Sequence, residues 1–137
     1  RNGSASRIWK APKTGLTDFL KGKEGNASTL TYPHPHYPTL DILPVGSLPS
    51  NPTELLATPS FAQLIETMRP NYDIILIDTP QADSIADASI IGIHVDATLF
   101  VVRTGRIMRS RLDELDALNQ SKEYKQIAVI LNATNNT

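Results

Sequence analysis

Apolar positions along the chain follow two different spacings. In residues 60–68 they recur three or four positions apart, at Phe61, Leu64, Ile65 and Met68. This spacing is typical of a helix with one apolar face. After Arg69 and Pro70 the spacing is lost, and residues 72–78 form a continuous apolar run with polar ends. Such a run predicts a strand that is buried on both faces, as in a parallel sheet.

Two later segments, residues 97–103 and 126–132, have the same form as residues 72–78. Helical spacing is present between these runs, near residues 86–94 and more clearly near 108–120. The alternation of strand and helix predicts an α/β fold with a doubly wound, mostly parallel sheet and helices on both faces.

The first third of the chain is less regular. Residues 1–14 are polar and basic and predict an irregular entry segment, whereas residues 15–20 predict a short helix. Residues 22–38 contain Pro33, Pro35 and Pro38 and predict a surface loop. Residues 40–46 predict a short strand that leads into a turn.

A further helix is expected at residues 51–56. Asn51 is a favourable N-cap residue, and Pro52 suits the first helical position because it lacks an N–H. Glu54 lies three residues after Asn51, where an acidic side chain reaches back to the N-cap backbone.

Composition excludes several classes of function. The chain has 137 residues and a formal net charge of −1, so no basic field indicates nucleic acid. It has no cysteine, which rules out disulfides and fits a reducing compartment. No apolar run approaches the roughly 20 residues of a membrane helix, so no membrane insertion by this segment is expected. Because the chain starts at Arg1 without an initiator Met, it is interpreted as a piece of a longer polypeptide.

The polar residues that follow the predicted strands are the candidate site. In open parallel sheets, ligands bind beyond the carboxyl ends of the strands, which places Asp78, Arg103–Thr104 and Asn132–Ala133 along one edge. An aspartate at the end of such a strand helps to hold Mg²⁺ in P-loop proteins, because Mg²⁺ prefers oxygen ligands. The alternative is that Asp78 caps the following turn.

The other candidate residues each have two interpretations. Asn132 can donate and accept hydrogen bonds at once, which suits an adenine edge, but it is equally a turn residue. Arg103 suits a phosphate or a partner carboxylate, or is a solvated strand end. Asp87 is more typical of a helix start than of a switch loop. His34 and His36 lack a matching ligand cluster, which favours ordinary loop residues over a metal site.

A phosphate-binding P-loop is missing from the sequence. The run G-x-x-x-x-G-K-[ST], whose backbone amides and lysine hold the phosphates of a nucleotide, does not occur. By itself the chain is therefore not expected to bind ATP tightly or to transfer a phosphoryl group.

The ordered set of segments nevertheless resembles bacterial protein-tyrosine kinases (BY-kinases) of capsule and exopolysaccharide biosynthesis, and specifically the C-terminal portion of their kinase domain. The similar segments are GLTDFL (15–20), LDILPVG (40–46), LPSNPTELL (48–56), YDIILIDTP (72–80), ADA (86–88), VVR (101–103) and VILN (129–132). They cover most of the chain, in the order and spacing of the family.

The resemblance implies an incomplete P-loop NTPase-like domain, residues 1–137, whose P-loop strand lies upstream. It implies a non-specific protein-tyrosine kinase that uses ATP and Mg²⁺, autophosphorylates tyrosines and regulates polysaccharide polymerisation and export. The partners it implies are a membrane polysaccharide co-polymerase with an activator domain, and further copies in a ring-like homo-oligomer. The location it implies is the cytoplasmic face of the bacterial inner membrane.

Residue by residue, the resemblance makes Asp78 the Walker B acid and the metal ligand. Asn132 matches the adenine side, and Arg103 lies near it as a nucleotide-side residue. Arg1 matches the last residue of a second acidic motif and is assigned with Asp78 to catalysis. Gln81 departs from the family, which often has a second proline after the Walker B Thr-Pro pair.

Two alternatives stay open beside the kinase. One is a P-loop ATPase of the partitioning or septum-positioning class, and the other is a non-catalytic scaffold of the same fold. The proline-containing segment 48–56 favours the kinase. Without the P-loop strand, the isolated chain is expected to fold poorly or to aggregate, because buried strand edges would be exposed.

Overall fold

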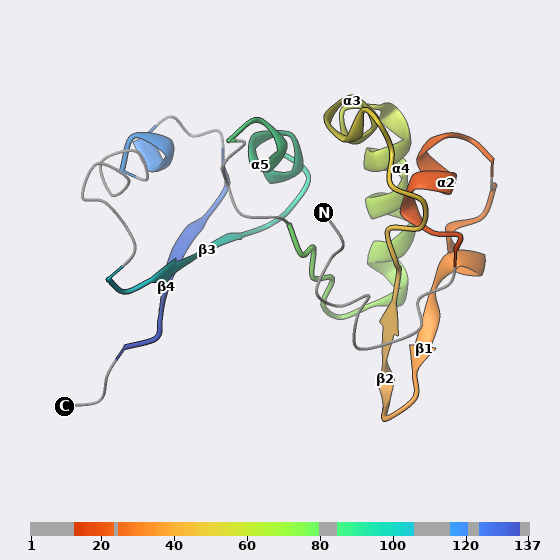
Figure 1. Cartoon of the computed structure of the whole chain (residues 1–137), viewed down its shortest axis with the longest axis horizontal. Helices are drawn as coiled ribbons and strands as arrows, with labels where there is room; N and C mark the ends of the chain where they lie inside the picture. The colour runs from red at the N-terminus through yellow and green to blue at the C-terminus, as the bar shows by residue number, and fades with distance from the viewer. Residues whose placement is uncertain (1–12, 24, 80–84, 106–115, 121–123, 135–137) are drawn as a thin grey trace. The chain divides into compact units, whose positions relative to one another are not determined.

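A computed structural model describes residues 13–23, 25–79, 85–105, 116–120 and 124–134, with the backbone alone for residues 85–88. The chain divides into two compact units, residues 1–83 and 84–137, which are described one at a time. Figure 1 shows the helices and strands of each unit.

The first unit is built around a small helical core. Its helices are α2 (Leu16–Leu20), η1 (Ala27–Leu30), α3 (Pro52–Leu56), α4 (Pro59–Met68) and η2 (Arg69–Asn71). The longest of them, α4, buries Phe61, Leu64, Ile65 and Met68, which are the four apolar positions that its sequence spacing indicated. Leu64 and Met68 pack with Ala27 of η1, and Leu43 and Tyr72 cover this cluster. The predicted amphipathic helix is confirmed.

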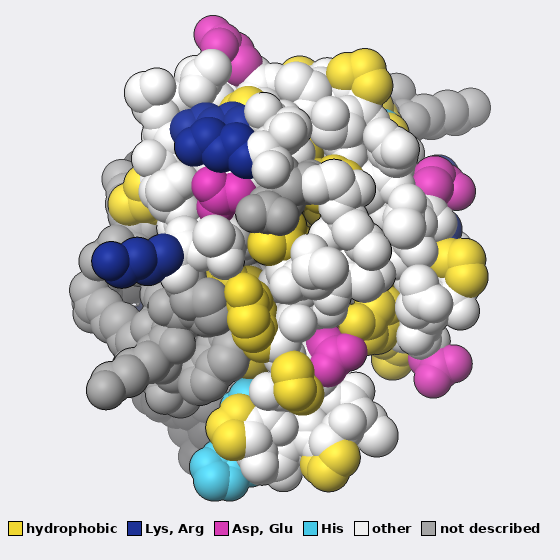
Figure 2. Space-filling model, turned by 90° about the vertical axis from the view of Figure 1, so that its right-hand side faces the viewer, with side chains coloured by type: hydrophobic (Ala, Val, Ile, Leu, Met, Phe, Trp, Pro, Cys, Tyr) yellow, Lys and Arg dark blue, Asp and Glu magenta, His cyan; other side chains and the backbone are white. Residues whose placement is uncertain are grey.

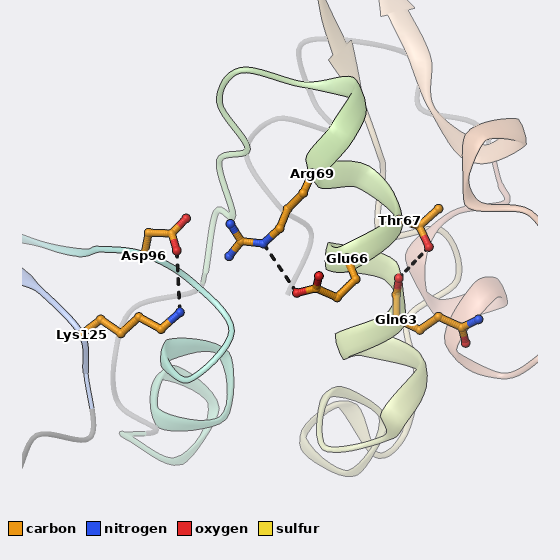
Figure 3. A network of polar contacts seen from close by, with 6 residues as sticks. All are labelled: Gln63, Glu66, Thr67, Arg69, Asp96 and Lys125. Atoms are coloured by element: carbon orange, nitrogen blue, oxygen red, sulfur yellow. Dashed lines mark hydrogen bonds and ion pairs between the residues drawn. The ribbon is translucent and has the colours of Figure 1, made fainter.

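The opposite face of α4 is polar. The Thr67 hydroxyl donates to the Gln63 carbonyl at 2.8 Å, and Arg69 Nε lies 3.7 Å from Glu66 Oε1 (Figure 3). Both partners of this ion pair are solvent-exposed to a substantial degree, so it contributes at most about 1 kcal/mol to stability. The helix is therefore held mainly by its apolar face.

The predicted loop at residues 22–38 is wrong in part. The structure has η1 there and then a hairpin of β1 (Tyr32–His34) and β2 (Tyr37–Ile42), paired antiparallel. The strand predicted at residues 40–46 thus ends at Ile42 and begins earlier. The prolines in this segment argued against strands, because proline is excluded from central strands. In a two-stranded sheet both strands are edge strands, where a missing N–H is tolerated.

Helix α2 begins against a loop, and Gly15 and Gly46 make this close contact possible. The amides of Leu16 and Thr17 donate to the carbonyls of Pro44 and Val45 at 2.8 and 3.0 Å. A Cβ on Gly15 would lie 2.1 Å from the Pro44 carbonyl oxygen, so only glycine fits. The helix predicted at residues 15–20 is confirmed, and its start is fixed by tertiary hydrogen bonds.

Helix α3 is confirmed, but its capping differs from the prediction. Asn51 makes no side-chain hydrogen bond to the backbone of the helix start. Its Nδ2 donates instead to Glu54 Oε2 at 2.7 Å. The two residues interact side chain to side chain, so the predicted capping box is wrong, although Pro52 does occupy the first turn.

The strand predicted at residues 72–78 is not present in the structure. Residues 74–79 carry no strand pairing, and Ile74 and Leu76 are 76 % and 84 % exposed. A strand is defined by its ladder partners, and among the described residues this apolar segment has none. The apolar composition that indicated a buried strand is real, but no described strand pairs with this segment.

The second unit is one parallel strand pair with a helix. Strand β3 (Thr98–Arg103) pairs with β4 (Ile127–Asn132) over six positions in register, and α5 (Ile85–Gly92) precedes them. Tyr124 is buried with an edge-on ring contact to Phe100 at 6.0 Å. Its ring also occupies the space beside Gly92, where a Cβ would lie 2.6 Å from two ring carbons. The two predicted strands and the helix near residues 86–94 are confirmed, with the helix ending at Gly92.

Of the helix predicted at residues 108–120, the described part, residues 116–120, is helical. The described residues thus form two separate two-stranded sheets. The parallel pair is the portion of the predicted α/β sheet that they contain. No helix in these ranges has the length and hydrophobicity needed to cross a bilayer.

Candidate functional site

The carboxyl ends of β3 and β4 bring together two of the predicted site residues. Arg103 and Asn132 are Cα partners in the parallel ladder, and both are exposed. Beyond them the Thr104 amide donates to the Asn132 carbonyl at 3.0 Å, and the Thr104 hydroxyl donates to the Ala133 carbonyl at 2.5 Å. The strand ends are therefore tied together by the residue that follows Arg103.

The Asn132 side chain is partly engaged by its own backbone. Its Oδ1 accepts a hydrogen bond from the Ala133 amide at 2.7 Å, and Ala133 has a φ of 56°, in the left-handed region. The amide oxygen thus accepts one hydrogen bond inside the turn and keeps a second lone pair, and the amide nitrogen keeps its two donor hydrogens. The predicted donor-and-acceptor role of Asn132 stays a prediction.

Asp78 belongs to the other compact unit. It is exposed and follows the extended apolar segment that ends at Ile77. An exposed carboxylate at the end of an extended segment has the hard oxygen donors that suit Mg²⁺. Within the part of the chain that the structure describes, no group of three or more metal-ligating side chains occurs. Asp78 alone suits a metal that takes one or two carboxylates and completes its shell with water and phosphate oxygens.

One predicted residue, Arg1, lies outside the described ranges, and Asp87 is described in backbone only, within α5. Their assignments remain predictions.

His34 and His36 lie at the hairpin turn. His34 Nδ1 accepts a hydrogen bond from the His36 amide at 3.2 Å, and the two rings are 5.9 Å apart. One nitrogen of the pair is therefore occupied by the turn itself. This arrangement is a local contact between the last residue of β1 and the hairpin turn.

One polar pair was not anticipated from the sequence. The Tyr72 hydroxyl donates to Asp41 Oδ2 at 2.7 Å and links the end of β2 to the segment before residue 74. The Asp41 carboxylate, together with partial burial, raises the pKa of Tyr72 above its ordinary value of 10.0. The two residues are 31 positions apart, and no sequence pattern connects them.

The chain has clear relatives among known proteins, although no family profile matches it. It is 33 % identical to the tyrosine-protein kinase CpsD of Streptococcus agalactiae, over 98 % of this chain and 59 % of CpsD. It is 34 % identical to the putative tyrosine-protein kinase EpsB of Ralstonia solanacearum, over 90 % of this chain and 16 % of EpsB. The chain therefore spans less than two thirds of the relatives that it matches.

Solved structures agree with these relatives. The kinase domain of the Escherichia coli tyrosine kinase ETK superimposes with a TM-score of 0.86 and 25 % identity, over 98 % of this chain and 52 % of that domain. The VpsO kinase domain gives 0.83 and 28 %, over 98 % of this chain and 66 % of that domain. The chain is thus a portion of a P-loop α/β kinase domain. It belongs to the bacterial tyrosine-protein kinases.

Proposed function

We propose that this chain is the C-terminal portion of the catalytic domain of an ATP-dependent protein-tyrosine autokinase that regulates capsule or exopolysaccharide polymerisation and export. The observation that carries the proposal is a likeness to tyrosine-protein kinases over 98 % of the chain, in both sequence and fold. The relatives and solved structures described above are named tyrosine kinases, which favours this proposal over a partitioning ATPase or a non-catalytic scaffold.

In this proposal Asp78 would hold Mg²⁺ together with ATP. When bound, the metal would supply positive charge that offsets the negative charge of the phosphates. The chain contributes one exposed carboxylate to this role, directly after the apolar residues 74–77. Arg1, at the end of the second acidic motif of the family, assists it.

The edge formed by β3 and β4 serves the nucleotide base. Since Asn132 Oδ1 is bound to the Ala133 amide, the Nδ2 hydrogens are the groups that donate to a ring nitrogen of adenine. Arg103, the register partner of Asn132, supplies a cation beside the nucleotide. Thr104 holds the two strand ends at fixed spacing through its contacts with residues 132 and 133.

The setting proposed for the parent protein is the cytoplasmic face of the inner membrane. Its partners there are a membrane polysaccharide co-polymerase, which supplies an activator segment, and further copies in a homo-oligomer. The support is the named relatives from capsule and exopolysaccharide systems.

The test is a comparison of two aspartates in the same segment. In the complete gene product, Asp78→Asn removes one negative charge at the metal and is expected to lower Mg²⁺-dependent tyrosine phosphorylation by about a hundredfold or more. Asp73→Asn makes the same change at an exposed position five residues earlier and is expected to keep the wild-type rate. The readout is incorporation of labelled phosphate into tyrosine at saturating ATP.

The outcomes separate the candidate functions. ATP hydrolysis without any phosphotyrosine indicates the partitioning class, and absence of both ATP binding and hydrolysis indicates a scaffold. If both variants lose tyrosine phosphorylation equally, the segment tolerates no change of charge. That result would contradict a specific metal-binding role for Asp78.

A further inference from the structure

The chain contains four tyrosines, and all of them lie in the described ranges, so their surroundings can be compared completely. A tyrosine that accepts a phosphoryl group must bring its oxygen within about 3–3.5 Å of the phosphorus, in line with the leaving oxygen. Its hydroxyl must therefore be accessible, and it must not be committed to a contact inside the fold.

Tyr124 does not meet this requirement. It is only 6 % exposed, and its ring fills the space beside Gly92 and packs edge-on against Phe100. Its hydroxyl lies 3.3 Å from the Ser89 hydroxyl. The phenolic oxygen points into the second unit and would leave it only if that unit opened.

Tyr72 and Tyr32 are half-buried and have hydroxyl partners. The Tyr72 hydroxyl donates to the Asp41 carboxylate at 2.7 Å, which also disfavours loss of the phenolic proton. The Tyr32 hydroxyl lies 3.3 Å from the Thr14 hydroxyl. Phosphorylation of either residue would first have to break a contact that ties the hairpin to another segment.

Tyr37 differs from the other three. It is 61 % exposed and is the first residue of β2, directly after the hairpin turn. Its ring packs against His34 with centroids 4.9 Å apart, and no hydrogen bond to its hydroxyl occurs among the described residues. Figure 2 shows histidine and hydrophobic side chains together at the lower end of the face, where the hairpin lies in Figure 1.

We propose that Tyr37 is a phosphorylation site on the hairpin formed by β1 and β2, a site within the folded domain. The inference rests on the proposed kinase function. The Tyr37 phenolic oxygen forms a bond to the γ-phosphorus of ATP while the bond from that phosphorus to the β,γ-bridging oxygen breaks. ADP leaves with that electron pair, and the phenolic proton passes to solvent or a base.

The surroundings of Tyr37 make the added charge effective. Residues 25–40 contain no Lys, Arg, Asp or Glu, so a phosphate of about −1.5 to −2 becomes the dominant charge on the hairpin. His34 Nδ1 accepts from the His36 amide, which leaves the ring proton on Nε2 as a donor toward a neighbouring phosphate. Phosphorylation thus converts an apolar, aromatic hairpin tip into an anionic one.

The experiment maps phosphate on the complete gene product after incubation with Mg²⁺ and ATP. Cleavage after glutamate releases residues 25–54, which contain Tyr32 and Tyr37 and neither of the other tyrosines. Fragment ions in mass spectrometry then assign the phosphate to one of the two. The expected result is phosphate on Tyr37. The phosphate is expected to be lost from this peptide in Tyr37→Phe and kept in Tyr32→Phe, which makes the same change five residues earlier on the same hairpin.

Phosphotyrosine elsewhere in the protein together with an unmodified Tyr37 overturns this inference and leaves the proposed function standing. Phosphate on Tyr32 in place of Tyr37 also overturns it, because the ranking by exposure and hydroxyl contact would then be wrong. Absence of phosphotyrosine from the entire protein overturns the proposed function as well. The three results are distinguished in one set of spectra.

Discussion

Three glycines of the first unit offer one substitution with three different physical consequences. Gly15 has an extended backbone (φ −178°), which any residue adopts, but an added Cβ would lie 2.1 Å from the Pro44 carbonyl oxygen. Gly22 has open space around it but a φ of +71°. Gly25 has open space and carries no such restriction. Alanine at the three positions therefore separates a steric cost from a conformational one.

The magnitude at Gly15 follows from the contacts that a Cβ displaces. The atoms it meets belong to the backbone of the loop, which cannot rotate away, and overpacking of this kind costs about 1–3 kcal/mol. Moving the helix start away also stretches the hydrogen bonds from Leu16 and Thr17 to the loop, each with a net contribution of about 0.5–1.5 kcal/mol. We expect Gly15→Ala to lower the free energy of unfolding by about 2–5 kcal/mol.

The two other positions calibrate this value. Gly22→Ala is expected to cost about 1 kcal/mol, because a left-handed backbone disfavours a Cβ and a less flexible unfolded chain partly offsets that loss. Gly25→Ala is expected to stay within about 0.5 kcal/mol of the parent.

Urea unfolding of the complete gene product, followed by circular dichroism, gives the three values at equal slope. Amide exchange of residues 16 and 17 shows whether the loss is local. A Gly15→Ala value no larger than that of Gly22→Ala would refute the reasoning, because the clash with backbone atoms would then be relieved at little cost.

Three further outcomes are expected. Because the pKa of Tyr72 is raised by Asp41, the contribution of this pair to stability is present below pH 10 and is lost as pH rises through the folded-state pKa. Tyr72→Phe should therefore flatten the alkaline fall in stability, as measured by unfolding at pH 8 to 11. Gly92→Ala should destabilise the second unit by about 1–3 kcal/mol, since its Cβ would meet the Tyr124 ring at 2.6 Å; tyrosine fluorescence during unfolding reports the loss. Thr104→Val should weaken nucleotide binding without loss of fold, because it removes the hydroxyl contact to the end of β4 and keeps the backbone hydrogen bond. Calorimetric titration with ADP measures the affinity. Thr104→Ser keeps the hydroxyl and is the control.

The spacing of apolar residues correctly predicted α4, β3 and β4. The apolar face of α4 was read directly from four residues because a helix of ten residues buries one face wherever it packs. The parallel strands β3 and β4 were likewise found from their continuous apolar runs. The predicted loop was wrong at residues 32–42, where the prolines lie in a hairpin with two edge strands. The predicted cap of α3 was wrong as well, because Asn51 bonds to Glu54 and not to the backbone.

The segment before Asp78 shows a second limit of the sequence. Its composition predicts a strand covered on both faces, but Ile74 and Leu76 are exposed, and the segment has no ladder partner among the described residues. Apolar composition predicts that a segment is buried, but it does not identify the residues that pack against it. The metal role of Asp78 therefore depends on its position in the family resemblance, and the matched aspartate variants are the direct way to test it.

Arg103 and Asn132 were predicted to lie at one edge of the sheet, and the structure pairs them there. The sequence placed both residues at the ends of parallel strands, and the register pairs them. Side chains alternate between the faces of a sheet, so a shift of one position would put Asn132 on the face opposite Arg103. The contacts of Thr104 with the carbonyls of residues 132 and 133 oppose that shift, because both are made only in the observed register. A residue that touches neither phosphate nor base in the proposal is thus the one that holds the nucleotide-side pair in place.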